Sequence, residues 1–461
     1  MLPWLVAVAF FMESLDTTIL NTAVPVVAKA LSVTPLSMKA VLASYTLSLA
    51  VFIPISGWVA DRFGTRRVFA SAIGIFTLGS LLCGLMNDIH LLIACRILQG
   101  CGGAMMVPVG RLTLVRTFPK SELIRAMSFV SIPALVGPML GPAAGGFIVA
   151  YLHWRAIFFL NVPIGILGLV LVWQRLPDYR EETRPLDFEG LVLFGSGIAL
   201  LSYVLEIFGE HTLSAEEILG LLGISFALLG GYVVHARRTP WPLLQLGLFR
   251  LRTFAAAVSG SFFTRLGIGG VPFLLPLLYQ VGLGLSPVVS GLLIMPQALA
   301  AITMKFGMQR LLKHFGYRAV LTANTLVMAV LLMLFATIGP GTPIWLIVVQ
   351  AFCYGALTST QYTSMNTLTY ADVPPQRASA ASSIASTAQQ LSMSFGVAIA
   401  GLVTMAFVPP EVRGNAGEMI GGLHEAFLTL GGFTMFSAIV FSRLKANDGA
   451  DETQQKDIHL G

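Results

Sequence analysis

Long apolar segments alternate with short polar segments along almost the whole chain. Most apolar segments reach the roughly 20 residues that an α-helix needs to cross the hydrocarbon core of a bilayer. This pattern predicts fourteen membrane-spanning helices, at residues 3–28, 38–60, 67–87, 91–115, 125–150, 155–175, 189–208, 216–235, 253–281, 287–308, 317–338, 344–369, 378–407 and 424–443. The predicted fold class is therefore an all-α integral membrane protein. The polar tail, 446–461, is predicted to be disordered.

Composition strengthens this interpretation. Of 461 residues, 56% are hydrophobic and 11% are charged, whereas a soluble protein carries about 25% charged residues. The net charge of +6 does not indicate a nucleic-acid partner, because the basic residues lie in short loops between apolar segments. The four cysteines lie in apolar segments without metal-ligand spacing, so neither a metal nor another cofactor is expected.

The distribution of basic residues predicts the orientation in the membrane. With the N-terminus inside, 21 of the 28 Lys and Arg side chains fall on the cytoplasmic side and four on the other side, while Arg96, Arg111 and Arg265 lie within helices. Cytoplasmic loops of membrane proteins carry the excess of Lys and Arg. Both termini are therefore predicted to be cytoplasmic.

Two acids, Glu13 and Asp16, lie near the middle of the first apolar segment. A carboxylate at the bilayer centre costs about 2.5–3.5 kcal/mol on insertion scales, so ionisable groups there usually mark a pathway. Their spacing of three residues places both on one side of a helix, which predicts a hydrated internal cavity rather than a structural accident. Arg96 also lies within an apolar segment and needs a partner, for which Asp16, Glu13 and backbone carbonyls are the candidates.

A weak internal repeat divides the chain. Residues 61–66 (DRFGTR) and 313–318 (KHFGYR) follow the second and tenth predicted helices and share the pattern Phe-Gly-x-Arg. Transporters are often built from two such similar halves. The predicted organisation is a six-helix half at 1–176, linkers with two inserted helices at 177–252, a second six-helix half at 253–445 and the tail at 446–461. In the second copy, Lys313 replaces the acid Asp61.

The first copy lies in a richer motif, 57–67 (GWVADRFGTRR). Gly57 is expected to permit close helix packing and Gly64 a tight turn. Asp61, followed by Arg62 and Arg66, can bond helix ends or arginines of the other half. The order of residue types resembles the signature between helices two and three of the major facilitator superfamily.

Three further motifs and one supporting stretch extend this resemblance over essentially the whole chain. Residues 96–103 (RILQGCGG) resemble the helix-four motif, whose arginine the family ties to proton coupling, and 137–146 (GPMLGPAAGG) resemble the helix-five antiporter motif. Residues 15–25 (LDTTILNTAVP) and 154–163 (WRAIFFLNVP) are similar to the fourteen-helix drug:proton antiporter branch (DHA2). The resemblance implies the major facilitator fold with helices arranged as six, two and six, in a bacterial cytoplasmic (inner) membrane. It also implies proton coupling through Asp16 and Arg96. Glu13 is an extra acid beside the motif, so the predicted coupling residues are Asp16, Glu13 and Arg96, and either acid could carry the proton.

The helix-five motif has a clear physical consequence. Gly137, Gly141 and Gly145 recur every four residues, so one side of the helix is bare backbone that allows close packing. Pro138 and Pro142 each remove a helical hydrogen bond and are expected to bend the helix. A bent, closely packed helix suits a hinge, so these five residues join the 57–67 motif as predicted gating residues.

The second half contains no acid within a predicted helix. Arg265 is the charged residue that lies far inside the first predicted helix of this half. Either substrate binding or pairing between the halves would account for it. Together with polar and aromatic neighbours from both halves, it defines a predicted substrate cavity at the membrane midplane, lined by Glu13, Tyr45, Arg265, Phe273, Gln297, Tyr354, Gln361 and Gln389.

The predicted function is a proton-coupled antiporter that exports small molecules, in particular lipophilic drugs, by alternating access. Its partners would be substrate, protons and the bilayer, and it is predicted to be a monomer. Two alternatives stay open: a dedicated metabolite or siderophore exporter or proton symporter of the same fold, and a transporter-like sensor or scaffold without flux. No phosphate loop or hydrolase, kinase or redox constellation is found in the sequence, so an enzyme is not predicted.

Overall fold

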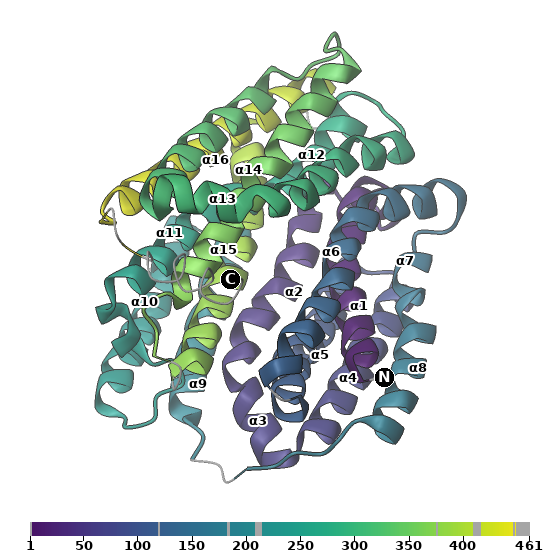
Figure 1. Cartoon of the computed structure of the whole chain (residues 1–461). Helices are drawn as coiled ribbons and strands as arrows, with labels where there is room; N and C mark the ends of the chain where they lie inside the picture. Colours follow the sequence, from purple (N-terminus) through teal and green to yellow (C-terminus); the bar gives the residue numbers. More distant parts are fainter. Residues whose placement is uncertain are drawn as a thin grey trace. The chain divides into compact units, whose positions relative to one another are not determined.

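The computed structural model describes residues 2–118, 120–181, 185–207, 214–374, 377–408, 416–445 and 448. Within these ranges the regular structure is helical and no strand occurs (Figure 1). The chain forms two compact units, Met1–Leu243 with Leu285–Leu292, and Leu244–Gly284 with Leu293–Gly461.

The first unit contains ten helices of the described chain and the start of an eleventh. They are α1 (Leu2–Ala30), α2 (Lys39–Phe52), α3 (Ser56–Phe63), α4 (Thr65–Leu85), α5 (Ile89–Thr117), α6 (Lys120–Tyr151), α7 (Ala156–Phe159), α8 (Asn161–Arg175), α9 (Phe188–Ile207) and α10 (Ala215–Arg238). In this unit α1 packs along α6, α5 packs against α2 and α4, and α9 pairs with α10. Fully buried apolar side chains, including Val6, Phe69 and Phe76, fill the space between these helices.

The second unit is built from the remaining long helices. They are α11 (Arg252–Ile268), α12 (Val271–Leu277), most of α13 (Pro287–Leu334), α14 (Ile344–Tyr370), α15 (Ala378–Phe407) and α16 (Ala416–Ser442). Here α11 packs against α14, α15 and α16. The boundaries predicted from the sequence for the halves and the linker stay a prediction.

The fourteen predicted segments all coincide with helices. Among the described residues, thirteen helical spans are long and apolar enough to cross a membrane. The fourteenth segment, 125–150, lies within α6, where the apolar part Val136–Tyr151 is shorter. Helix α6 continues without a break through Pro138 and Pro142. The length and composition of these helices identify a multi-pass membrane protein.

The glycines of the internal repeat share an unusual backbone conformation. Gly64 separates α3 from α4 with φ 95° and ψ 139°, and Gly316 interrupts α13 with φ 72° and ψ 164°. Glycine adopts positive φ without the steric penalty of a Cβ. The Phe-Gly-x-Arg pattern therefore marks the same local turn in each unit, as predicted for Gly64.

Candidate functional site

A buried ion pair joins α1 to α5 in the first unit. Arg96 Nη1 donates to Asp16 Oδ2 at 2.6 Å, and the side chains are 2% and 1% exposed. Hydrogen bonds between ionised groups are shorter and stronger than neutral ones. Of the partners that the sequence leaves open for Arg96, Asp16 forms the ion pair, and a backbone carbonyl, that of Val41, accepts a longer hydrogen bond.

Three polar side chains complete this site. Gln99 Nε2 and Asn161 Nδ2 each donate to Asp16 Oδ1 at 2.9 Å, and both amides also reach Ser80 Oγ, at 2.9 and 3.0 Å. Arg96 Nη1 donates a second bond to Gln99 Oε1 at 2.7 Å. We call these five residues the Asp16–Arg96 cluster. Its bonds offset part of the desolvation that a buried ion pair costs.

Helix α2 covers another side of the arginine. The Arg96 guanidinium carbon lies 4.3 Å from the centre of the Tyr45 ring, within the range of a cation–π interaction. Arg96 Nε also points at the carbonyl oxygen of Val41 at 3.5 Å. Close packing makes this possible, because a Cβ at Gly103 would lie 2.7 Å from Tyr45 Oη. The glycine-rich part of α5 thus brings α2 within reach of its charge.

Glu13 has a different environment from Asp16. It is half-buried, and no hydrogen bond or ion pair joins it to a residue in the described part of the chain. Arg111 exerts a favourable Coulomb interaction on Glu13 but is itself exposed. The shared hydrated face predicted for the two acids is therefore wrong for Asp16, which is enclosed by its partners. A three-residue step on a helix leaves about 60° between two side chains, so each can face a different neighbour.

Arg265 of α11 is the buried cation of the second unit. Its side chain is 2% exposed, Nε donates to Ser261 Oγ at 3.0 Å, and the guanidinium carbon lies 3.7 Å from the centre of the Tyr362 ring. No carboxylate of a described residue pairs with it. A buried arginine held by a hydroxyl and an aromatic ring retains the capacity to bind an anionic or strongly polar group.

The other residues predicted for the substrate cavity have mixed positions. Phe273 and Tyr354 are buried in packing, whereas Gln297 and Gln389 are half-buried. Gln361 accepts a hydrogen bond from Asn324 and donates one to Thr325, both at 2.8 Å, so its amide is used within the second unit.

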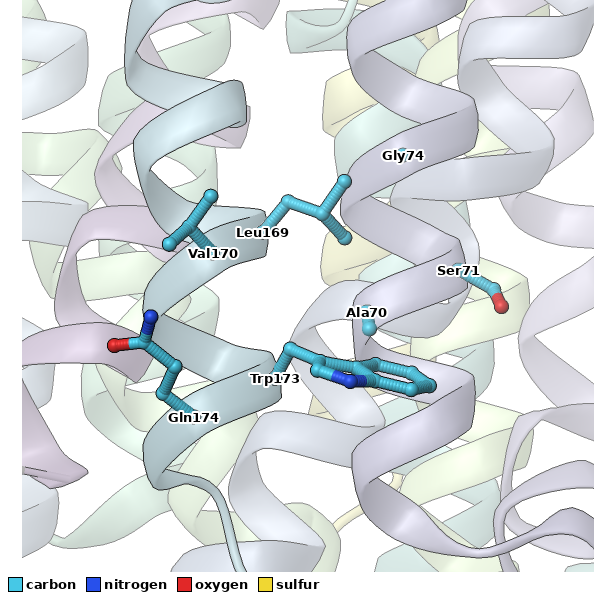
Figure 2. A pocket seen from close by; sticks show the side chains of 7 residues that line it. All are labelled: Ala70, Ser71, Gly74, Leu169, Val170, Trp173 and Gln174. Carbon is cyan, nitrogen blue, oxygen red and sulfur yellow. The ribbon is translucent and has the colours of Figure 1, made fainter.

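Two hollows in the first unit lie away from these residues. One hollow, of about 550 Å³, lies between α4 and α8 (Figure 2). The other, of about 440 Å³, lies between α6 and the first residues of α13. Neither hollow is lined by a residue predicted for the substrate cavity, and that prediction stays open.

The 57–67 motif is bonded within the first unit. Arg116 Nη2 lies 2.7 Å from both Asp61 Oδ1 and Glu181 Oε1. The backbone N–H of Arg66 donates to Asp178 Oδ1 at 3.1 Å. These contacts fix the junction of α3 and α4 to the end of α5 and to the segment that follows α8.

Gly57 takes no part in close packing within the first unit. Gly57 is exposed, and a Cβ added there would meet no atom within 4 Å. It lies on the outer side of α3, away from the neighbours that hold this helix, so it does not serve close packing here. Arg62 is likewise exposed.

Sequence reasoning missed four residues of these networks: Ser80, Gln99, Arg116 and Asn161. Gln99 and Asn161 stand inside the motifs at 96–103 and 154–163, and Gln99 follows Arg96 by one helical turn. Buried amides within apolar segments were the available signal, since such groups need hydrogen-bond partners. Ser80 gave no comparable signal.

The chain is similar over nearly its whole length to known proteins. The MdtD protein of Serratia proteamaculans (strain 568), named as a candidate multidrug resistance protein, is 41% identical over 458 residues, which cover 99% of this chain and 96% of that protein. The protein of the same name from Escherichia coli O7:K1 (strain IAI39 / ExPEC) is 42% identical over 441 residues, covering 96% and 94%.

Solved structures show the same fold. The POT family transporter PepTSo matches with a TM-score of 0.72 at 15% identity, covering 99% of each chain. A D-xylose–proton symporter matches with a TM-score of 0.70 at 14% identity, covering 97% of this chain and 98% of the symporter. At these identities the likeness concerns the fold alone.

The family assignment indicates a multi-pass inner-membrane transporter rather than an enzyme. The description "Major Facilitator Superfamily" belongs to a family model that matches residues 6–397, a range that includes the Asp16–Arg96 cluster and the four motifs. The resemblance predicted from those motifs is confirmed, and this chain belongs to the Major Facilitator Superfamily.

Proposed function

We propose that the protein is a proton-coupled antiporter that exports small lipophilic molecules from the cytoplasm by alternating access. The observation that carries this proposal is the Asp16–Arg96 ion pair, buried among membrane-spanning helices and satisfied by two amides. Coupling to protons needs a group that can gain and lose a proton during the transport cycle, and we assign this role to the Asp16 carboxylate.

The ion pair also supplies a way to link protonation to conformation. A proton on Asp16 would remove the negative partner of Arg96, and an uncompensated buried charge costs about 3–5 kcal/mol. The protonated first unit would therefore favour an arrangement in which Arg96 gains water or another partner. A ligand shifts a conformational equilibrium by its differential affinity for the two states, and here the proton is that ligand.

Several further features belong to the same proposal. The protein functions as a monomer in the inner membrane with both termini cytoplasmic, as its basic loops favour. The names of its MdtD relatives support drugs as the substrate class. Asp16 and Arg96 carry coupling, Glu13 and Arg265 contact substrate, and the motifs at 57–67 and 137–146 control gating.

Flux measurements test the proposal directly. Purified protein in proteoliposomes with an imposed pH gradient should accumulate a lipophilic dye in exchange for protons, and the dye should in turn collapse the gradient. Movement of dye and protons in the same direction would instead identify a symporter. Absence of flux, with substrate binding retained, would favour a sensor or scaffold.

Replacing Glu13 by glutamine is expected to narrow the substrate range. Glu13 is half-buried and has no bonded partner among the described residues, so the change should leave the fold intact. A charge pair at about 4 Å is worth about 1 kcal/mol even in water, so cationic substrates should lose about fivefold in transport while neutral analogues keep their rate. Paired cationic and neutral dyes in proteoliposomes provide the measurement, and an equal loss for both would contradict the assignment.

Replacing Asp61 by asparagine is expected to favour the inward-open state and slow turnover, because the resemblance implies that Asp61 pairs across the halves when the protein faces outward. In this structure the change also removes the charge that Arg116 binds. This contact is partly exposed, because the Asp61 side chain is 29% accessible and the Arg116 side chain 15%. A screened pair of this kind is worth about 1 kcal/mol, which changes a two-state ratio about fivefold.

Spin labels on the cytoplasmic ends of α3 and of the second part of α13 would report the shift. Lys313→Asn is the matched control, because Lys313 occupies the equivalent repeat position without an acid. A larger shift in the Lys313 variant than in the Asp61 variant would contradict this role.

A further inference from the structure

The groove between α4 and α8 has the form of a binding site that opens outward. Its lining consists of Ala70, Ser71, Gly74, Leu169, Val170, Trp173 and Gln174. Figure 2 shows Leu169 and Trp173 extending from α8 toward α4, with the Trp173 ring next to Ala70. The hollow has a volume of about 550 Å³ and is open along the outer side of the two helices.

The groove lies between two places where its walls are held together. One is the contact near Gly165, and the other is the start of α4, where Thr65 accepts a hydrogen bond from the Tyr179 backbone and Arg66 donates one to Asp178. At Gly165, an added Cβ would lie 2.9 Å from Thr77 Cβ, so the α8 backbone rests against the Thr77 side chain there. At Gly168 the nearest atom would be 3.8 Å away, and at Gly74 no atom lies within 4 Å. Between these contacts the groove is open along Ala70, Ser71 and Gly74, in the part of α4 that is nearer to its first residue.

One exposed basic side chain, Arg67, lies one helical turn from the groove on α4. Arg67 is exposed, and it shares one helical stripe with Ala70, Ser71 and Gly74, at spacings of three, four and seven residues. Within the described chain, Arg67 has no hydrogen bond or ion pair. The acid closest in sequence to the end of α8, Asp178, is occupied by the Arg66 backbone N–H and by Arg180 at 3.5 Å.

We propose that this groove binds one anionic phospholipid, with an acyl chain along α4 and α8 and the headgroup phosphate at Arg67. Basic residues at the edge of the hydrocarbon region attract anionic lipids, by about 1 kcal/mol each. A zwitterionic lipid would bring its ammonium group to the same arginine and bind less well. Trp173, which is 60% exposed, supplies an aromatic ring with a polar N–H, the type of side chain enriched at the headgroup level.

Lipid with brominated acyl chains provides the test, because bromine quenches tryptophan fluorescence at contact. Full-length protein is placed in nanodiscs of phosphatidylcholine that contain increasing fractions of brominated phosphatidylglycerol or brominated phosphatidylethanolamine. The contribution of Trp173 is the difference between the wild type and Trp173→Phe. Half-maximal quenching of this contribution is expected at an about fivefold lower fraction of the anionic lipid.

Two variants separate the headgroup contact from the acyl-chain contact. Arg67→Gln should abolish the preference between the lipids, and Gly74→Leu should fill the groove and remove most Trp173 quenching by either lipid. Arg238→Gln and Gly230→Leu are matched controls on α10, where Arg238 is exposed and Gly230 has open space; both should behave as the wild type. Equal quenching by the two lipids, or a preference retained in Arg67→Gln, would overturn the proposal and identify ordinary annular lipid. Neither result depends on transport.

Discussion

Replacing Asp16 by asparagine is expected to abolish proton-driven transport and to destabilise the first unit without preventing membrane insertion. Asparagine matches the carboxylate in shape but cannot ionise, so it neither carries the proton nor neutralises Arg96, which lies 2.6 Å away. Removing one partner of a buried ion pair costs about 3–5 kcal/mol, because the remaining charge stays buried. Transport and thermal stability should therefore fall together in this variant.

A second variant distinguishes loss of coupling from loss of stability. In Asp16→Asn/Arg96→Gln both charges are absent, and neutral amides can still bond to Gln99, Asn161 and Ser80. Replacing both members of a buried ion pair is often neutral or stabilising, so most of the lost thermal stability should return. Proton-driven transport should stay absent, because no ionisable group remains in the cluster.

The measurements are the melting temperature of purified protein and pH-gradient-driven flux in proteoliposomes at equal protein content. Normal flux in the single variant would show that the proton is carried elsewhere, with Glu13 as the first candidate. Full recovery of flux in the double variant would show that the cluster has a structural role only. Both results would contradict the proposed coupling.

The sequence predicts the helices well because bilayer thickness sets a minimum apolar length, which each segment displays independently of tertiary contacts. It also predicts the turn at Gly64, since the Phe-Gly-x-Arg pattern needs a residue that tolerates positive φ. The repeat copy at Gly316 adopts a similar conformation. These features depend on local sequence alone.

Tertiary partners are harder to predict. The partner of Arg96 stayed open because α1 and α5 are far apart in sequence, and Asn161 joins Asp16 across 145 positions. The spacing of Glu13 and Asp16 suggested a common environment, but a 60° difference in direction is enough to bury one and leave the other accessible. Exposure of Gly57 could not be inferred either, because a glycine on a helix surface looks identical in sequence to one at a packed interface.

The glycines of α6, unlike Gly57, lie at a closely packed interface. The substitution Gly141→Leu tests whether this packing is needed for transport. A Cβ at Gly137 would lie 2.8 Å from Ser14 Cβ, and one at Gly141 would lie 2.8 Å from Thr18 Cβ and 3.1 Å from the backbone nitrogen of Ile19. Helix α1 therefore rests almost directly on the α6 backbone, with Asp16 only two residues from Thr18.

A leucine at position 141 must push α1 away or bend α6. Overpacking of this kind costs about 1–3 kcal/mol, so the unit should still fold and insert. The displacement acts on the helix that carries Asp16, so we expect transport to fall at least about tenfold, equivalent to about 1.4 kcal/mol in the barrier. The balance between the two access states should also shift, because α1 and α6 can no longer approach each other as closely.

Gly432→Leu in α16 is the matched control, since Gly432 is exposed and an added Cβ there meets no atom within 4 Å. Transport in proteoliposomes and labelling of engineered cysteines from each side of the membrane report the two expected effects. Normal transport and unchanged labelling in Gly141→Leu would mean that α1 and α6 can separate without consequence. The close contact would then serve only to hold the bundle together, and gating would depend on other helices.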